Sequence, residues 1–360
     1  MADPDHVEAL ANNTSGWPYH VAAVVAVDGD HHITVEQAAG ERDAKQKKGA
    51  PGIIDMYDTL EDARLAYRTF FQDSFPAPDG VSFDSVDADG VAAECATPAD
   101  AVPGRHLVYL HGGAYLAGDP QGYRGLVGDL ARRLRARVLV PHYRLAPEAV
   151  FLAPIEDAVT AYRCLLEEGA EPHNVVLAGD SAGGAMAVSA LVAARDQGLP
   201  MPAASIAISP WANLEHTGAT MFTLDGVDPS VNRAGLSRAA DIVLGGAPRN
   251  NPLASPVFAD TRGLPPVLIQ TGGHEVMLSD AVRLAAKLAE DFVPLRLDVA
   301  PGMGHVWHLL AAHLPAADKA VADAVAFAEE HLPAAVAEEI AEGLGRPDGA
   351  SCGSTATQVP

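Results

Sequence analysis

The sequence has few cysteines, few basic side chains and no long apolar run. Its three cysteines, Cys95, Cys164 and Cys352, are odd in number and widely spaced, so they predict neither a disulfide framework nor a metal site. Only 24 Lys and Arg stand against 47 Asp and Glu, which gives a formal net charge of -23. This balance disfavours nucleic acid and anionic membrane surfaces as partners, because both need a basic patch.

The N-terminus has neither the basic region nor the apolar region of a secretion signal, and no segment reaches membrane-spanning length. We therefore expect a cytoplasmic protein with reduced thiols.

The sequence does contain an alternating series of predicted strands and helices. At 360 residues and 48% apolar composition, the chain is long enough to bury a large core. A strand pair is expected at 81–86 and 91–96 around a turn at Asp89-Gly90. The alternation that follows predicts an α/β fold, with a mostly parallel sheet and helices on both faces. Strands are expected at 106–110, 137–141, 175–178, 204–210, 266–271 and 295–299, and helices at 123–135, 155–168, 185–191, 279–290 and 317–330.

Three further segments frame this core. Residues 1–75 read as an N-terminal layer, including a basic segment at 45–48 and a helix at 60–72 that packs on the core or covers a pocket. Residues 211–262 interrupt the alternation of strands and helices and contain one predicted helical stretch, at about 236–243. We expect this insertion to lie at the carboxyl edge of the sheet, where ligands bind. Residues 333–360 read as a flexible tail. The domain prediction is therefore an extension with cap helices at 1–75, a main domain at 76–332 with a cap insertion at about 211–245, and the tail.

A Gly-x-Ser-x-Gly motif lies between the predicted strand at 175–178 and the helix that follows it. Gly179, Ser181 and Gly183 form this motif, and its strand-to-helix context favours a nucleophilic serine. Glycines are needed there because strand and helix pass very close to the serine.

A serine hydroxyl needs a base and an acid before it can act as a nucleophile at neutral pH. His305 follows the last predicted strand, and His308 is the alternative base. Glu275 follows the strand that ends at Thr271, and Asp280 is the alternative acid, although an acidic residue there also suits a helix N-terminus. The order Ser, Glu, His along the chain is that of the α/β-hydrolases.

The oxyanion that forms during acyl transfer needs backbone donors. His111-Gly112-Gly113-Ala114 ends an earlier strand, so we expect the amides of Gly112 and Gly113 to serve, together with the amide of Ala182.

These motifs resemble the hormone-sensitive-lipase family of α/β-hydrolases, the bacterial family IV esterases marked by a His-Gly-Gly-Gly motif. The resemblance covers roughly residues 60–332 and is carried by HGGAY at 111–115, YRLAPE at 143–148, GDSAGG at 179–184, SPW at 209–211, NPLASP at 251–256 and MGH at 303–305. It implies an α/β-hydrolase fold with a helical cap, and a serine carboxylic-ester hydrolase. It also supports Glu275 as the acid, because family members with a glutamate there have a similar Glu-Val-x-Leu segment.

The sequence departs from the family in three places. Ala114 replaces the third glycine of the oxyanion motif, residues 149–154 replace the usual His-Pro-Phe-Pro-Ala-Ala, and residues 1–58 exceed the usual N-terminus. We expect the extra segment to enlarge the cap or to join a homodimer. Short- to medium-chain acyl esters are the expected substrates, with lactones or an acetylated metabolite as alternatives and a non-catalytic small-molecule receptor as the alternative outside enzymes. No metal or organic cofactor is expected.

Overall fold

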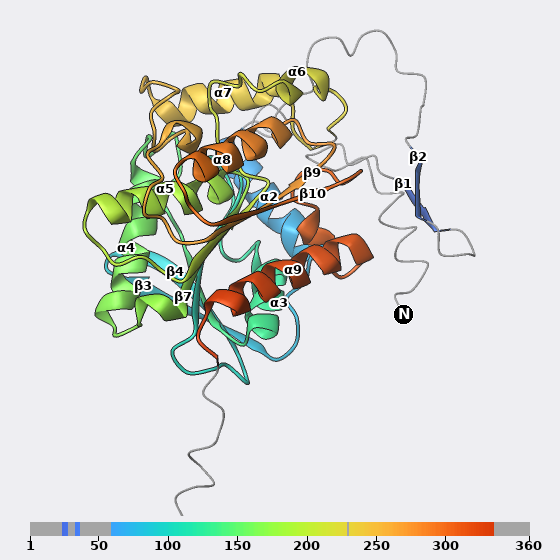
Figure 1. Cartoon of the computed structure of the whole chain (residues 1–360). Helices are drawn as coiled ribbons and strands as arrows, with labels where there is room; N and C mark the ends of the chain where they lie inside the picture. The colour runs from blue at the N-terminus through green and yellow to red at the C-terminus, as the bar shows by residue number, and fades with distance from the viewer. Residues whose placement is uncertain (1–23, 28–32, 37–58, 229, 335–360) are drawn as a thin grey trace, which may run out of the picture.

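The computed structural model describes residues 24–27, 33–36, 59–228 and 230–334 (Figure 1). The predicted basic segment at 45–48, Cys352 and nearly all of the predicted tail lie outside the described residues. The N-terminal layer is described only in part.

An eight-stranded sheet forms the centre of the protein, in the order β10-β9-β8-β7-β5-β6-β4-β3. The strands β5 to β10 pair in parallel, whereas β4 is antiparallel to both β3 and β6. The mostly parallel sheet expected from the sequence is confirmed. Its strands are β3 (Val81–Ala88), β4 (Val91–Pro98), β5 (His106–Leu110), β6 (Arg137–Pro141), β7 (Val175–Asp180), β8 (Ala204–Ile208), β9 (Val267–Gly272) and β10 (Leu295–Ala300).

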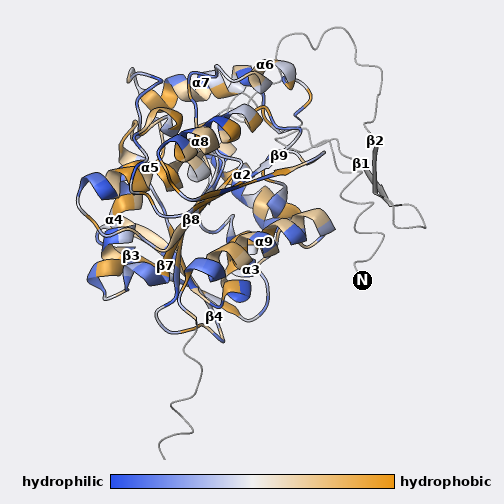
Figure 2. Cartoon of the chain, viewed as in Figure 1, coloured by the Kyte–Doolittle hydropathy of each residue, from blue (hydrophilic) through white to orange (hydrophobic). Residues whose placement is uncertain are grey.

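The central strands read as continuous apolar runs because both of their faces are covered. Along β5, Leu107 and Tyr109 enter one hydrophobic cluster and Val108 and Leu110 enter the other, as the alternation of side chains along a strand requires. One cluster joins the sheet to α4 (Ala153–Glu167), α5 (Ala182–Asp196) and α8 (Leu278–Glu290). The second joins it to α2 (Leu60–Ser74), α3 (Arg124–Leu134) and α9 (Pro315–His331). Apolar residues accordingly concentrate in the sheet and on the helix sides that face it (Figure 2).

The helices lie where the sequence predicted them, with ends that differ by a few residues. Those of the main domain are α3 (Arg124–Leu134), α4 (Ala153–Glu167), α5 (Ala182–Asp196), α8 (Leu278–Glu290) and α9 (Pro315–His331). The prediction for α5 covered only 185–191. The helix is longer at both ends because it begins directly after Ser181 and stays buried through Ala194.

The N-terminal layer contains the expected helix and an unexpected hairpin. The helix α2 (Leu60–Ser74) is capped by Thr59, whose hydroxyl accepts the Asp62 amide. The strands β1 (Val24–Val27) and β2 (Ile33–Glu36) form an antiparallel pair that the sequence reading did not predict. Their β-branched residues carried the signal, which the surrounding polar composition obscured.

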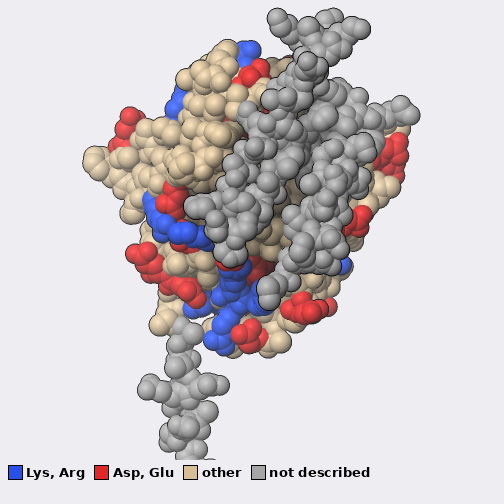
Figure 3. All heavy atoms as spheres, turned by 90° about the vertical axis from the view of Figure 1, so that its right-hand side faces the viewer, with Lys and Arg blue, Asp and Glu red and all other residues tan. Residues whose placement is uncertain are grey.

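The insertion after β8 carries two helices, α6 (Thr220–Thr223) and α7 (Arg233–Leu244), which lie above α8 in Figure 1. The second one is the helical stretch predicted at about 236–243, and its apolar side joins the same cluster as α5. On the face turned toward the viewer in Figure 3, basic side chains lie interspersed with acidic ones. Among the described residues, no helix is long and apolar enough to cross a membrane.

Candidate active site

Ser181 stands at the sharp turn between β7 and α5. Its backbone has φ 54° and ψ -118°, a conformation that side-chain-bearing residues rarely adopt and that the surrounding structure must hold. The Ser181 amide donates to the Ile208 carbonyl at 2.8 Å, which fixes the turn against the neighbouring strand. A Cβ atom at Gly183 would lie 1.9 Å from the Leu110 carbonyl oxygen, so only glycine allows this close approach.

The loops after β9 and β10 bring a histidine and a glutamate to this serine. His305 Nε2 lies 2.9 Å from Ser181 Oγ, and His305 Nδ1 lies 3.0 Å from Glu275 Oε2. The Glu275 side chain is fully buried, and that of His305 is 8% exposed. The three residues that the sequence singled out thus form one continuous hydrogen-bonded chain at the carboxyl edge of the sheet.

A further serine, which the sequence analysis did not single out as functional, supports this chain. The Ser209 hydroxyl donates to Glu275 Oε1 at 2.7 Å and accepts the Val306 amide at 3.1 Å. The Gly272 amide also donates to Glu275 Oε1. Ser209 directly follows β8, so its place at the same sheet edge was the available signal.

The two alternative residues point elsewhere. Asp280 lies in the first turn of α8, where it accepts the Asn213 amide at 3.1 Å, and burial raises its pKa well above the ordinary value. His308 Nε2 lies 2.9 Å from the Gln270 side-chain oxygen, and burial lowers the pKa of His308 to about 3. Both side chains are fully buried, and the structure pairs neither with Ser181, His305 or Glu275.

The expected oxyanion donors need one correction. The Gly112 amide already donates within the protein, to Asp180 Oδ1 at 3.0 Å and to the Tyr123 hydroxyl at 3.1 Å. It is therefore not available to a substrate oxygen, contrary to the prediction. Within the described part of the chain, the amides of Gly113, Ala114 and Ala182 have no acceptor.

The absence of a side chain at Gly112 instead allows the Asp180 carboxylate to lie against the backbone there. A Cβ atom there would lie 2.3 Å from Asp180 Oδ2. Ala114 adopts φ 55° without being a glycine, so the family's third glycine is replaced at a position where glycine is the easier residue.

The electrostatics of the site centre on His305. Burial disfavours its protonated form, but the hydrogen bond and charge of Glu275, together with the charges of Asp228 and Asp180, outweigh burial. The pKa of His305 is therefore raised above 6.5. Burial also raises the pKa of Asp180, to about 6, although the tyrosine hydroxyls that donate to it work in the opposite direction.

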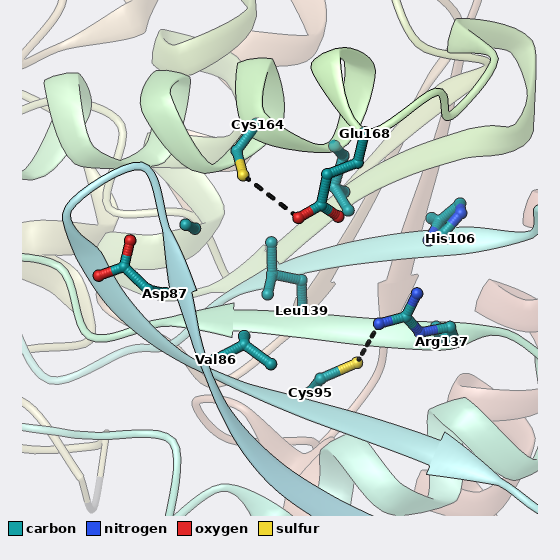
Figure 4. A pocket seen from close by; sticks show the side chains of 10 residues that line it. Val86, Asp87, Cys95, His106, Arg137, Leu139, Cys164 and Glu168 are labelled. Carbon is teal, nitrogen blue, oxygen red and sulfur yellow. Dashed lines mark hydrogen bonds between the residues drawn. The ribbon is translucent and has the colours of Figure 1, made fainter. Parts of the chain in front are cut away.

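A cavity lies away from this site (Figure 4). His106 and Arg137, which line it, stand at the amino ends of β5 and β6, whereas the Ser181 chain is at the carboxyl ends of the parallel strands. Cys95 and Cys164 also line this cavity, and both are free thiols. In the ranges that the structure describes, no three His, Cys, Asp or Glu side chains gather as a metal site would require.

Known proteins are similar to this chain in sequence and in fold. A family described as having the alpha/beta hydrolase fold matches residues 107–309. An acetyl-hydrolase of Streptomyces hygroscopicus is 46% identical over 224 residues, which cover 62% of this chain and 75% of that protein. A putative acetyl-hydrolase of Mycobacterium tuberculosis, LipR, is 37% identical over 257 residues, covering 71% of this chain and 83% of LipR.

Solved structures agree. An esterase from the bacterial hormone-sensitive lipase family superposes with a TM-score of 0.75 and 39% identity, covering 80% of this chain and 95% of that one. The esterase EstE5, in crystals soaked with p-nitrophenyl butyrate, superposes with a TM-score of 0.74 and 38% sequence identity. The match covers 79% of this chain and 95% of EstE5.

The fold and the matches define a hydrolase of the carboxylesterase type. The chain belongs to the α/β-hydrolase family, in the group of bacterial hormone-sensitive-lipase esterases. The family resemblance, the fold class and the ester hydrolase expected from the sequence are confirmed.

Proposed function

We propose that Ser181, His305 and Glu275 hydrolyse carboxylic esters through an acyl-enzyme intermediate. The observation that carries this proposal is the chain of contacts from Ser181 Oγ to His305 Nε2, at 2.9 Å, and from His305 Nδ1 to Glu275 Oε2, at 3.0 Å. Ser181 Oγ attacks the acyl carbon while His305 Nε2 takes its proton. His305 then returns that proton to the leaving alcohol oxygen, and Glu275 holds the imidazole in place and stabilises the imidazolium.

The second half of the cycle uses the same groups. A water molecule loses its proton to His305 Nε2 and attacks the acyl carbon, and Ser181 leaves as the free hydroxyl. We assign the oxyanion to the amides of Gly113, Ala114 and Ala182, because these are free while the Gly112 amide is not. Each such donor typically contributes about 3 kcal/mol in the transition state.

For the substrate we propose short acyl groups, acetyl among them. Two relatives bear the names acetyl-hydrolase and putative acetyl-hydrolase, which supports acetyl esters and keeps deacetylation of a metabolite as the second candidate.

Lactones remain in the proposed range, because a lactone is an ester whose leaving alcohol stays attached. A non-catalytic receptor is disfavoured by the hydrogen bond between Ser181 and His305. The domain limits, the cytoplasmic location and the homodimer stay predictions from the sequence.

The test compares hydrolysis of nitrophenyl esters from acetate to laurate by the full chain and by Ser181→Ala. We expect turnover to peak at short chains and to fall to background in Ser181→Ala, with circular dichroism as the check on folding. A fluorophosphonate probe should label the wild type once per chain and leave Ser181→Ala unlabelled. Turnover that survives in Ser181→Ala would overturn the assignment of the nucleophile.

A further inference from the structure

The cap insertion is hydrogen-bonded to the loop that carries Glu275. The Thr220 hydroxyl donates to the Val276 carbonyl at 2.7 Å, and the Ser279 amide donates to that hydroxyl at 2.8 Å. Asp228, also from the insertion, accepts the Val276 amide on Oδ2 at 2.9 Å. The residue that directly follows Glu275 is thus held through both its carbonyl and its amide.

Asp228 is built into this contact and does not face solvent. It is 7% exposed, and its second oxygen, Oδ1, accepts the amides of Ser230 at 2.9 Å and Val231 at 3.2 Å. Three backbone donors therefore fix the carboxylate in one orientation. A buried carboxylate is unfavourable unless it is satisfied in this way, so the arrangement holds a negative charge at a defined place.

We propose that Asp228 is a positioning residue for the ester hydrolysis, which holds the Glu275 loop through the Val276 amide and adds a second negative charge to the electrostatic environment of His305. The inference rests on the proposed function, since it acts through His305 and Glu275. In this proposal Asp228, a side chain of the cap insertion, influences the protonation of the base His305.

The charges around His305 support this role. The carboxylates that act on His305 are Glu275, Asp228 and Asp180, and together they raise its pKa against the opposing effect of burial. His305 and Glu275 in turn act electrostatically on Asp228. Burial raises the pKa of Asp228, the charge of Glu275 raises it further, and His305 and the backbone donors lower it.

The consequence for catalysis has a definite sign. The base must be neutral to accept the serine proton, so kcat/KM rises with pH through the pKa of free His305. Without the negative charge of Asp228, protonated His305 is less stable and its pKa falls. The acid limb of the profile then moves to lower pH, and kcat falls because the imidazolium formed in the transition state has lost a stabilising charge.

A residue with only a structural role would behave differently. It would lower activity or stability at every pH but leave the midpoint of the acid limb in place. The pH profile therefore separates the two roles.

The experiment measures kcat and kcat/KM on nitrophenyl acetate from pH 5 to 9 for the wild type, Asp228→Asn and Asp225→Asn. Asp225 is the matched control, because it lies in the same insertion, is exposed, and accepts one amide, that of Arg233, at 3.1 Å. We expect Asp228→Asn to move the acid limb down by about 0.5 to 1 pH unit, the size expected when one interacting charge is removed. We also expect its kcat to fall about tenfold, while Asp225→Asn matches the wild type.

Asp228→Glu separates the charge from the hydrogen bonds. It keeps the charge but displaces it by one methylene, so we expect a lower kcat with the acid limb near that of the wild type. Asp228→Ser replaces Asp228→Asn if the latter fails to fold, since it is also uncharged and retains one acceptor.

An acid limb in a folded, uncharged variant that coincides with that of the wild type would overturn the proposal, and so would an equal shift in Asp225→Asn. Failure of the underlying function is recognised separately, because then Ser181→Ala would retain turnover.

Discussion

Asp180 Oδ1 accepts the Gly112 amide at 3.0 Å, so the residue before the nucleophile holds the loop that carries the free amides. Two tyrosine hydroxyls complete this contact, that of Tyr109 on Oδ1 at 2.9 Å and that of Tyr123 on Oδ2 at 3.0 Å. Because β5 and β7 are neighbours in the sheet, their ends meet here, and one buried carboxylate joins the nucleophile turn to the oxyanion loop.

Asp180→Ala tests this connection. The change removes the shared acceptor of the Gly112 amide and of two buried hydroxyls, although the amide keeps the Tyr123 hydroxyl as a second acceptor. Each buried donor left without a partner costs about 1 to 3 kcal/mol. We expect the free energy of unfolding to fall by roughly 3 kcal/mol and kcat to fall with it. Urea unfolding and nitrophenyl acetate turnover measure the two effects. A variant with the stability and kcat of the wild type would show that the oxyanion loop keeps its position without Asp180.

The order of strands and helices in this protein was predictable from its sequence, because the patterns that indicate them are local. Apolar runs of strand length alternate with helix patterns, and the turn at Asp89-Gly90 joins β3 to β4 as expected. The hairpin of β1 and β2 was not predicted. Its strands are only four residues long, so too few positions were available to show a period.

The site was predictable in its residues but not in its hydrogen bonds. Ser181, Glu275 and His305 each follow a strand, and the carboxyl ends of parallel strands share one edge of the sheet. Which amide of the oxyanion motif is free depends on Asp180 and Tyr123, which lie 68 and 11 residues from Gly112 along the chain. The roles of Ser209 and Asp228 likewise arise only once distant loops are in contact.

The choice between Glu275 and Asp280 as the acid can be tested by neutralising each. Glu275→Gln should lower kcat by about 10³- to 10⁴-fold, as amide replacement does in the serine protease triad, because the histidine then loses its correct tautomer and its counter-charge. Asp280→Asn should keep kcat within about tenfold of the wild type. Burial raises the pKa of Asp280 well above its ordinary value, which favours the neutral form that asparagine imitates. Equal losses in the two variants would contradict the assignment.

The raised pKa of His305 predicts the acid limb of the pH profile. His305 acts as a base only when neutral, and the carboxylates of Glu275, Asp228 and Asp180 together outweigh burial in favouring the charged form. We therefore expect kcat/KM of the wild type to fall on acidification with a midpoint above 6.5, the ordinary histidine value. A profile of kcat/KM on nitrophenyl acetate measures this midpoint. Values below 6.5 would mean that burial dominates.

Substitutions at Gly113 and Ala114, two neighbouring residues of the oxyanion loop, should affect activity differently. Gly113→Ala places a Cβ atom 2.1 Å from the Ala117 carbonyl oxygen on a backbone with φ 118°, so the loop must move and its donors lose their positions. Loss of one donor lowers kcat by about 10²- to 10³-fold, and we expect a change of that size.

Ala114→Gly relieves the left-handed backbone at that position but adds freedom to the unfolded chain, and the two effects nearly cancel. We expect stability within about 1 kcal/mol of the wild type and kcat within tenfold. Thermal unfolding and turnover of both variants check the contrast, and a larger kcat loss in Ala114→Gly than in Gly113→Ala would reverse the assignment.

Ser209 supports both partners of Ser181 at once, which makes Ser209→Ala an informative change. Its hydroxyl donates to Glu275 Oε1 and accepts the amide next to His305, so the variant frees the carboxylate and the histidine loop together. The Gly272 amide still donates to Oε1, so Glu275 keeps one of its donors but is less firmly held. We expect kcat to fall about ten- to a hundredfold, with KM little changed, because the lost contacts orient catalytic groups and bind no substrate. A raised KM with unchanged kcat would instead place Ser209 in substrate binding.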